Sequence, residues 1–140
     1  MKRSLLSIIA MLTMVTLGCA KDTKDPKTSG KDKWLTHLNA KEAKALLDKK
    51  PAPLVLDIRT PFELKSGTIP GAFPANYYGK DFEERVAKID RKQPILLHCR
   101  SGGRSTESLE IFKKLKFQKI YHLDGGILAW QKEGFPIEKK

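Results

Sequence analysis

Two hydrophobic patterns alternate along residues 34–140. Short, nearly continuous apolar runs occupy 53–58, 94–98 and 120–123, as is typical of strands buried on both faces. Apolar residues three or four positions apart predict helices over 40–49, 82–89, 105–116 and 127–132, and a further short helix follows Thr60. Strands that alternate with helices predict an α/β domain in which a parallel sheet carries helices on both faces. In such sheets the ligand site lies beyond the carboxyl ends of the strands.

Start signals support two of these helices. Asn39 is followed three residues later by Glu42, which is the spacing of a capping box for a helix that begins at residue 40. Thr60 and Glu63 have the same spacing, with a proline at the first helical position, and Gly67 is expected to end this short helix.

The amino end has the layout of a secretory signal. Lys2 and Arg3 supply positive charge, and residues 5–17 form an apolar run that only Ser and Thr interrupt. As a helix this run spans about 20 Å, which is short of the ~30 Å hydrocarbon core of a membrane. We therefore predict a signal peptide over residues 1–18.

Residues 15–19 resemble a bacterial lipoprotein box, in which a cysteine is lipidated and becomes amino-terminal. Cys19 occupies the cysteine position, while Thr16 and Leu17 depart from the usual residues. Two alternatives stay open, namely cleavage after Ala20 as an ordinary secreted protein and retention as an uncleaved anchor. All three place the rest of the chain outside the cytoplasm. We expect a periplasmic, membrane-anchored lipoprotein whose membrane partner is reached through Cys19.

The segment after Cys19 reads AKDTKDPKTSGKDK and contains no aromatic or branched aliphatic residue. Such a composition predicts a flexible tether, which we place together with the lipidated cysteine at residues 19–33. The folded domain then occupies residues 34–140.

The net charge of +11 comes from 27 Lys and Arg against 16 Asp and Glu. The lysines are mostly interspersed with acids, and no basic stripe is interleaved with aromatic residues, so nucleic-acid binding is not expected. The positive net charge is explained equally well by attraction to anionic lipid headgroups and to small anionic substrates. We expect a soluble, monomeric domain.

The chain has only two cysteines, which excludes a scaffold built on several disulfides. There is no Cys-x-x-Cys pair and the three histidines are scattered, so we expect no metal site and no cofactor.

Cys99 begins the most informative segment, a six-residue loop that lies between a strand ending at His98 and a helix beginning near Ser105. Its two glycines let the backbone curl and expose consecutive N–H groups. The amino end of the following helix and the two arginines of the loop also favour a thiolate over a thiol. The loop therefore predicts an anionic sulfur beside a cradle for a second anion.

Three blocks carry a resemblance to a known family. They are LDIRTPFEL over 56–64 with GTIPGA over 67–72, CRSGGRS over 99–105, and LDGGILAW over 123–130. Together they resemble the single-domain rhodaneses, which are sulfurtransferases, over almost all of residues 34–140. The resemblance implies a five-stranded parallel sheet flanked by helices, with the cysteine loop at its carboxyl edge. Thr68 stands where the family usually has His, and we expect it to serve turn packing.

The resemblance implies that the Cys99 thiolate takes a sulfane sulfur from thiosulfate or a similar donor as a persulfide. A thiophilic acceptor, either cyanide or a thiol, would then receive the sulfur. The loop residues expected to bind substrate are Arg100, Ser101, Gly102, Gly103, Arg104 and Ser105. The two arginines are expected to attract the anionic donor. The alternative is a rhodanese-fold module that carries or senses persulfide for a partner protein without fast turnover.

Related phosphatases of the same architecture place five residues between the cysteine and the arginine of their loop. Here four residues separate Cys99 from Arg104, and the smaller ring favours a sulfane sulfur over a phosphoryl group. We therefore do not expect phosphatase chemistry.

Residues outside the loop are assigned supporting or ordinary roles. Asp57 and Arg59 end a strand near the same edge of the sheet, and by resemblance Asp57 is expected to pair with an arginine of the loop and support its shape. His98 is expected to point away from the loop, as alternate strand residues do. His37 and His122 are expected to be ordinary surface or core histidines.

Overall fold

The computed structural model describes residues 33–139 and contains one five-stranded sheet. Its strands are β1 (Leu35–Leu38), β2 (Leu54–Asp57), β3 (Phe73–Pro74), β4 (Ile95–His98) and β5 (Ile120–Leu123). They lie in the order β1-β5-β4-β2-β3, and each neighbouring pair is parallel. The predicted α/β class and the five-stranded parallel sheet are therefore confirmed.

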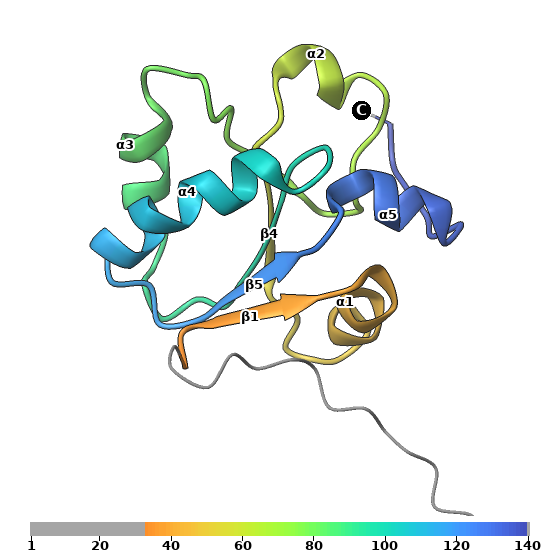
Figure 1. The fold of residues 1–140 in the computed structure, drawn as a ribbon, viewed down its shortest axis with the longest axis horizontal. Helices are drawn as coiled ribbons and strands as arrows, with labels where there is room; N and C mark the ends of the chain where they lie inside the picture. The colour runs from red at the N-terminus through yellow and green to blue at the C-terminus, as the bar shows by residue number, and fades with distance from the viewer. Residues whose placement is uncertain (1–32, 140) are drawn as a thin grey trace, which may run out of the picture.

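Helices cover both faces of this sheet, as Figure 1 shows. They are α1 (Ala40–Leu47), α2 (Pro61–Leu64), α3 (Phe82–Ala87), α4 (Gly103–Lys114) and α5 (Gly126–Lys132). Buried residues of α3 and α4 pack on one face, and those of α1 and α5 pack on the other. The short α2 lies between β2 and β3 in the chain and, as described below, contacts the cysteine loop.

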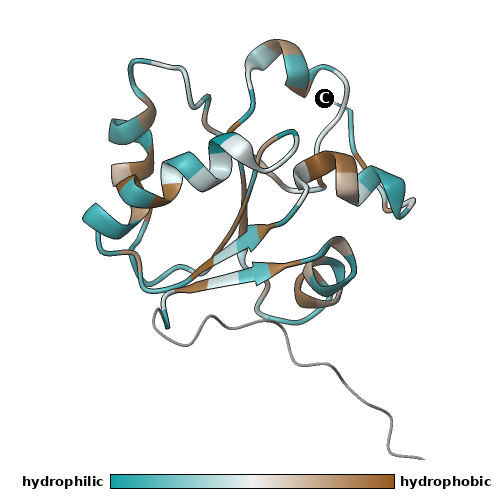
Figure 2. Ribbon diagram, viewed as in Figure 1, coloured by the Kyte–Doolittle hydropathy of each residue, from teal (hydrophilic) through white to brown (hydrophobic). Residues whose placement is uncertain are grey.

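The core is split between the two faces of the sheet, with the central strand β4 buried on both. Ile95, Leu96 and Leu97 in β4 have no exposed surface, and the apolar colour of Figure 2 occurs both in strands and on the helices that cover them. Burying each such side chain contributes roughly 1.5–3 kcal/mol. The near-continuous apolar run of this strand follows from its burial on both faces.

The two predicted capping boxes are present. The Asn39 side chain accepts from the backbone N–H of Glu42 at 3.0 Å, and the Glu42 carboxylate accepts from the backbone N–H of Asn39 at 2.8 Å. The Thr60 hydroxyl and the Glu63 carboxylate make the same reciprocal pair at the start of α2. Each box satisfies two backbone N–H groups that a helix start would otherwise leave without a partner.

Helices α1, α3 and α4 each end two residues before the predicted end, α2 ends at Leu64 rather than at Gly67, and three further differences concern the sheet and the cysteine loop. The pattern did not indicate β1, which is a four-residue edge strand containing Thr36 and His37, or β3, which has two residues. Helix α4 starts at Gly103 rather than near Ser105, because Gly102 in the left-handed region (φ +107°) forms the turn into the helix. Two residues of the predicted loop thus belong to the first turn of α4.

Within residues 33–139 no helix is both long and apolar enough to cross a membrane. The predicted signal peptide (1–18) and nearly all of the predicted tether (19–33), including Cys19, lie outside the described residues.

Candidate active site

Cys99 directly follows β4 at the carboxyl edge of the sheet, where the ligand site of a parallel sheet is expected. The side chain is almost fully enclosed, with 1% of the residue exposed. The loop from Cys99 turns through Gly102 into α4, so the amino end of this helix faces the sulfur. Aligned peptide dipoles place a partial positive charge there.

Hydrogen-bond donors surround the sulfur. The backbone N–H of Gly102 donates to Cys99 Sγ at 3.1 Å, and the Ser105 hydroxyl lies 3.5 Å from the same atom. Burial raises the pKa of the Cys99 thiol, but hydrogen bonds from the Ser105 side chain and from the backbone of Ser105, Gly102 and Ser101 outweigh it. The pKa of Cys99 therefore lies below its ordinary value, as expected for a nucleophilic cysteine.

The first turn of α5 is hydrogen-bonded to the backbone of the cysteine loop. The backbone N–H groups of Ile127 and Leu128 donate to the carbonyl oxygens of Cys99 and Arg100, at 3.0 Å and 3.1 Å. A Cβ atom at Gly126 would lie 2.6 Å from both of these oxygens. Since real Cβ atoms do not approach oxygen so closely, only glycine permits this contact. Gly126, the first residue of α5, thus allows the close contact that positions the cysteine loop, while Gly125 forms the turn into the helix.

Arg104 is held in a two-point ion pair with Glu63 of α2. Its Nη1 and Nη2 atoms lie 2.8 Å and 2.6 Å from the two carboxylate oxygens, and its guanidinium lies over the Tyr78 ring. The hydrogen bond from Arg104 lowers the pKa of Glu63 to about 2. The charge of Arg104 is therefore compensated, which the sequence reasoning did not anticipate because it assigned Glu63 only to the capping box.

Asp57 does not pair with an arginine of the loop, so this prediction is wrong. Its carboxylate accepts from Arg59 Nη2 at 2.6 Å and from the Thr68 hydroxyl at 2.7 Å, and both members of the Asp57–Arg59 pair are buried. Asp57 is the last residue of β2 and Arg59 follows two residues later. Because Arg59 is so near in the chain, it pairs with Asp57 in place of an arginine of the cysteine loop.

The Asp57–Arg59 pair supports the loop indirectly. Arg59 donates to the backbone carbonyl oxygens of Glu63 and Gly67, at 3.3 Å and 2.8 Å. These bonds hold the carboxyl end of α2 and the turn that follows it, and α2 presents the Glu63 carboxylate to Arg104. Thr68 is therefore more than turn packing, because its hydroxyl completes the hydrogen bonding of the buried Asp57 carboxylate.

The other loop residues lie at the surface or in the turn. Arg100, Ser101 and Gly103 are exposed, whereas Gly102 and Ser105 are buried. Within the described part of the chain, no hydrogen bond or ion pair engages the Arg100 side chain. Of the two loop arginines, Arg100 is thus the one whose charge is open to an incoming anion.

His98 points away from the sulfur, as predicted. Its Nε2 atom lies 3.6 Å from Asp57 Oδ2, and its Nδ1 atom lies 3.2 Å from the Cys99 carbonyl oxygen. Burial lowers the pKa of His98, which keeps the imidazole neutral near pH 7. Nothing in this arrangement gives His98 a base role at Cys99.

His122 and His37 are not ordinary. His122 Nε2 lies 2.9 Å from Ser105 Oγ, which connects this histidine to the cysteine loop. The Nδ1 atoms of His122 and His37 both lie 2.8 Å from Asp124 Oδ1. The sequence alone did not indicate this cluster, because His37 is far from His122 and Asp124 in the chain. The parallel pairing of β1 with β5 brings His37 beside His122.

Comparisons with known proteins agree with this geometry. A family model described as a rhodanese-like domain matches residues 39–133, a range that includes all three sequence blocks. A sulfurtransferase of Allochromatium vinosum is 33% identical over 84 residues, which cover 60% of this chain and 77% of that protein. Thiosulfate sulfurtransferase GlpE of Vibrio cholerae is 28% identical over 102 residues, which cover 73% and 93%.

A solved structure has the same fold. The crystal structure of a rhodanese-related protein from Thermoplasma volcanium has a TM-score of 0.66 and 28% identity, and the match covers 74% of this chain and 98% of that one. Some relatives are much longer proteins. The match to tRNA uridine(34) hydroxylase of Pelagibacter ubique is 33% identical but covers only 36% of that protein, so the likeness concerns one part of it.

Proposed function

The chain belongs to the rhodanese-like domain family, and from this premise we propose that it is a sulfurtransferase that carries sulfur as a persulfide on Cys99. The observation that carries the proposal is the set of donors aimed at one buried sulfur, with the Gly102 N–H at 3.1 Å from Cys99 Sγ. Such donors stabilise the negative charge that the sulfur bears both before the reaction and as a persulfide.

In the first step, the Cys99 thiolate attacks the outer sulfur of thiosulfate. A new S–S bond forms to Cys99, the S–S bond of thiosulfate breaks, and its electron pair leaves on sulfite. The anionic persulfide stays in the loop, where the N–H groups of Ser101, Gly102 and Ser105 are available as donors. The exposed Arg100 side chain attracts the anionic donor to the rim.

In the second step, a thiophilic acceptor attacks the terminal sulfur of the persulfide. With cyanide, a carbon–sulfur bond forms to give thiocyanate, and the electrons of the S–S bond return to the Cys99 thiolate. The enzyme is restored without an external oxidant or reductant, and no metal or cofactor takes part. A thiol acceptor leaves with the sulfur as its own persulfide in the same way.

The proposal is tested by steady-state turnover with thiosulfate and cyanide, measured as thiocyanate formed by the parent and by Cys99→Ser. We expect multiple turnovers by the parent and none by the variant. A single equivalent of thiocyanate per chain, with no further turnover, would instead support the alternative persulfide carrier or sensor that serves a partner protein. Equal turnover by the two proteins would contradict both.

We further propose that the protein is exported and works as a monomer held at the periplasmic side of a membrane through a lipid on Cys19. The proposal rests on the signal-like residues 1–18 and the tether-like residues 19–33. Expression in a bacterial host followed by fractionation should place the parent in the membrane fraction. Cys19→Ser should release it from that fraction, and an unchanged membrane association would argue against the lipid anchor.

A further inference from the structure

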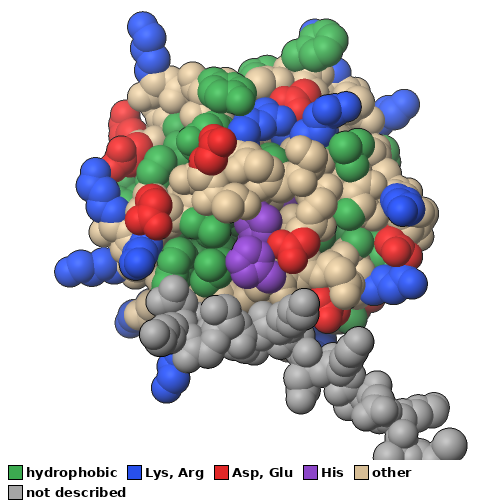
Figure 3. Space-filling model, viewed as in Figure 1, with side chains coloured by type: hydrophobic (Ala, Val, Ile, Leu, Met, Phe, Trp, Pro, Cys, Tyr) green, Lys and Arg blue, Asp and Glu red, His purple; other side chains and the backbone are tan. Residues whose placement is uncertain are grey.

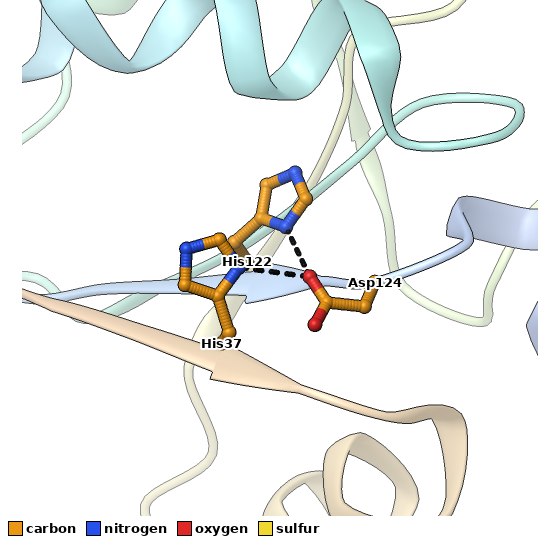
Figure 4. A group of neighbouring side chains, drawn as sticks. All are labelled: His37, His122 and Asp124. Carbon is orange, nitrogen blue, oxygen red and sulfur yellow. Dashed lines mark hydrogen bonds and ion pairs between the residues drawn. The ribbon is translucent and has the colours of Figure 1, made fainter. Parts of the chain in front are cut away.

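Three side chains able to bind metal meet at the carboxyl ends of β1 and β5, beside the cysteine loop (Figure 4). His37 and His122 are direct partners in the register of these adjacent parallel strands. Asp124 follows two residues after His122, so its side chain points to the same side of the sheet. We call these three residues the histidine cluster.

The donor atoms of the cluster converge on one point. Asp124 Oδ1 lies 2.8 Å from Nδ1 of His37 and 2.8 Å from Nδ1 of His122, and all three atoms lie within 4.8 Å of one another. Ligand atoms of a tetrahedral zinc lie about 3.3 Å apart, because each bond is ~2.0–2.1 Å long. An ion can therefore enter if the carboxylate oxygen moves about 0.5 Å away from each nitrogen and the two nitrogens, which lie within 4.8 Å of each other, take up the same spacing.

We propose that His37, His122 and Asp124 form a binding site for a late first-row divalent cation, with Zn²⁺ as the probe. Two imidazole nitrogens and one carboxylate oxygen are a ligand set that suits zinc and its neighbours. The two imidazole nitrogens make this set less suited to Ca²⁺ or Mg²⁺, which prefer oxygen ligands.

Binding changes the tautomer of both histidines without a net loss of protons. Without the ion, Nδ1 of each ring faces Asp124 Oδ1, and since a carboxylate oxygen only accepts, the hydrogen of this contact is on Nδ1. With the ion, Nδ1 of each ring donates its lone pair to the metal, and the proton moves through solvent to Nε2. Asp124 exchanges two hydrogen bonds for one bond to the metal.

The surroundings of His122 fit the metal-bound tautomer. Its Nε2 atom lies 2.9 Å from Ser105 Oγ and 3.3 Å from Thr106 Oγ1, so an Nε2–H has an acceptor in place. Metal-bound histidines nearly always donate their second ring nitrogen in this manner, which fixes the ring for coordination. Ser105 is itself 3.5 Å from Cys99 Sγ, so a bound ion would lie one side chain away from the reactive sulfur.

The cluster is open to solvent on one side and fixed on the other. The His122 side chain is 3% exposed, whereas those of His37 and Asp124 are 39% and 55% exposed. Histidine side chains reach the surface on the face shown in Figure 3. Water can therefore deliver the ion and occupy the fourth position of a site with three protein ligands.

The test uses the full chain without a polyhistidine tag, in a Cys19→Ser/Cys99→Ser background that removes both thiols. This background also makes the result independent of the proposed sulfur chemistry. Calorimetric titration with Zn²⁺ is expected to give one ion per chain. His37→Gln and Asp124→Asn should each weaken binding by at least about tenfold, while Asp90→Asn, at an exposed aspartate elsewhere, should leave it unchanged.

A second measurement guards against an effect on folding. The EPR spectrum of bound Cu²⁺ should show coupling to two imidazole nitrogens in the background protein and to one in His37→Gln. The inference is overturned if Zn²⁺ binds equally to all four proteins, since the ion would then sit elsewhere, or if no binding occurs at millimolar Zn²⁺.

Discussion

The donors that face Cys99 Sγ are mostly backbone N–H groups and one hydroxyl. The sequence predicted that backbone N–H groups, the helix amino end and the two loop arginines stabilise a thiolate; Arg104 is engaged by Glu63, and hydrogen bonds from Ser105, Gly102 and Ser101 lower the pKa of Cys99. A hydrogen bond that favours the charged form of an acid lowers its pKa, in the same way as a nearby positive charge does. Ser105 therefore stabilises the thiolate together with the backbone N–H groups of the loop.

Removing the Ser105 hydroxyl should raise the pKa of Cys99. Ser105→Ala keeps the backbone N–H but loses the side-chain donor, which is one of the hydrogen bonds that lower this pKa. The rate of alkylation by iodoacetamide, measured against pH in a Cys19→Ser background, should shift its midpoint upward. Ser101→Ala, which also keeps its backbone N–H, should not move the midpoint. An unshifted midpoint in Ser105→Ala would show that the hydroxyl does not stabilise the thiolate.

Glu63 should contribute stability that depends on pH. Its pKa falls from 4.5 in the unfolded chain to about 2 in the folded protein, so the contribution is complete above pH 4.5 and is lost as the pH falls toward 2. Glu63→Gln keeps the capping box but removes the charge, and it should lower the free energy of unfolding by roughly 2–3 kcal/mol at pH 7.

Urea unfolding at pH 7 and pH 3 measures this effect. The difference between parent and Glu63→Gln should shrink to less than half at pH 3. The control is Glu84→Gln, because Glu84 and Lys88 form an exposed pair whose loss should change little. A difference that is the same at both pH values would contradict the role given to the Glu63–Arg104 pair.

The sequence revealed those site residues that are adjacent in the chain. The loop from Cys99 to Ser105 could be identified because glycines, arginines and a cysteine stand together after an apolar run. Glu63, His37 and Asp124 were missed, since their partners lie 41, 87 and 87 residues away in the chain. Asp57 was assigned the wrong partner because the resemblance indicated a supporting role but not which arginine is nearer.

Among the elements, the contact between α5 and the cysteine loop decides where the sulfur lies. The first turn of α5 donates two N–H groups to the carbonyl oxygens of Cys99 and Arg100, and Gly126 makes room for them. The third sequence block is thus tied to the second by backbone hydrogen bonds. These bonds explain why Gly126 stands at the start of α5, whereas a Cβ at Gly125 would instead meet Ala129 Cβ at 2.7 Å.

Gly126→Ala should displace the cysteine loop. The added Cβ would meet two carbonyl oxygens at 2.6 Å, and the positive φ of this residue (+58°) adds strain. We expect sulfur transfer from thiosulfate to cyanide to fall by about tenfold or more, as small displacements of a nucleophile can cause. Circular dichroism should remain that of the folded protein.

The matched control in the same helix is Leu128→Ala, which shortens an exposed side chain and keeps the N–H that donates to Arg100. Its sulfur transfer should match that of the parent. Full activity in Gly126→Ala would mean that the loop tolerates displacement and that α5 does not position it.

The elements that the sequence predicted are those with a strong period or a cap. Short, nearly continuous apolar runs identified β2, β4 and β5, whereas β1 has two polar residues between its two leucines and β3 is too short to show any period. The start of α4 was placed too late because glycine gives no helical signal, although here Gly102 provides the turn that begins the helix.

For the whole molecule, the sheet order places all the chemistry at one edge. The carboxyl ends of β2, β4 and β5 lead to the Asp57–Arg59 pair, the cysteine loop and the histidine cluster. Helices on both faces bury the sheet and leave this edge to the loops, as in other parallel sheets. The alternation of strand and helix in the sequence was sufficient to predict this arrangement, but not the contacts made across it.

The central claim is that Cys99 accepts a sulfur atom, and intact mass spectrometry after incubation with thiosulfate tests it most directly. In a Cys19→Ser background Cys99 is the single remaining thiol. The account predicts that this protein gains the mass of one sulfur atom, loses it again on addition of cyanide, and gains nothing when Cys99 is also replaced by serine. No gain in mass with Cys99 present, or an equal gain without it, would contradict the account.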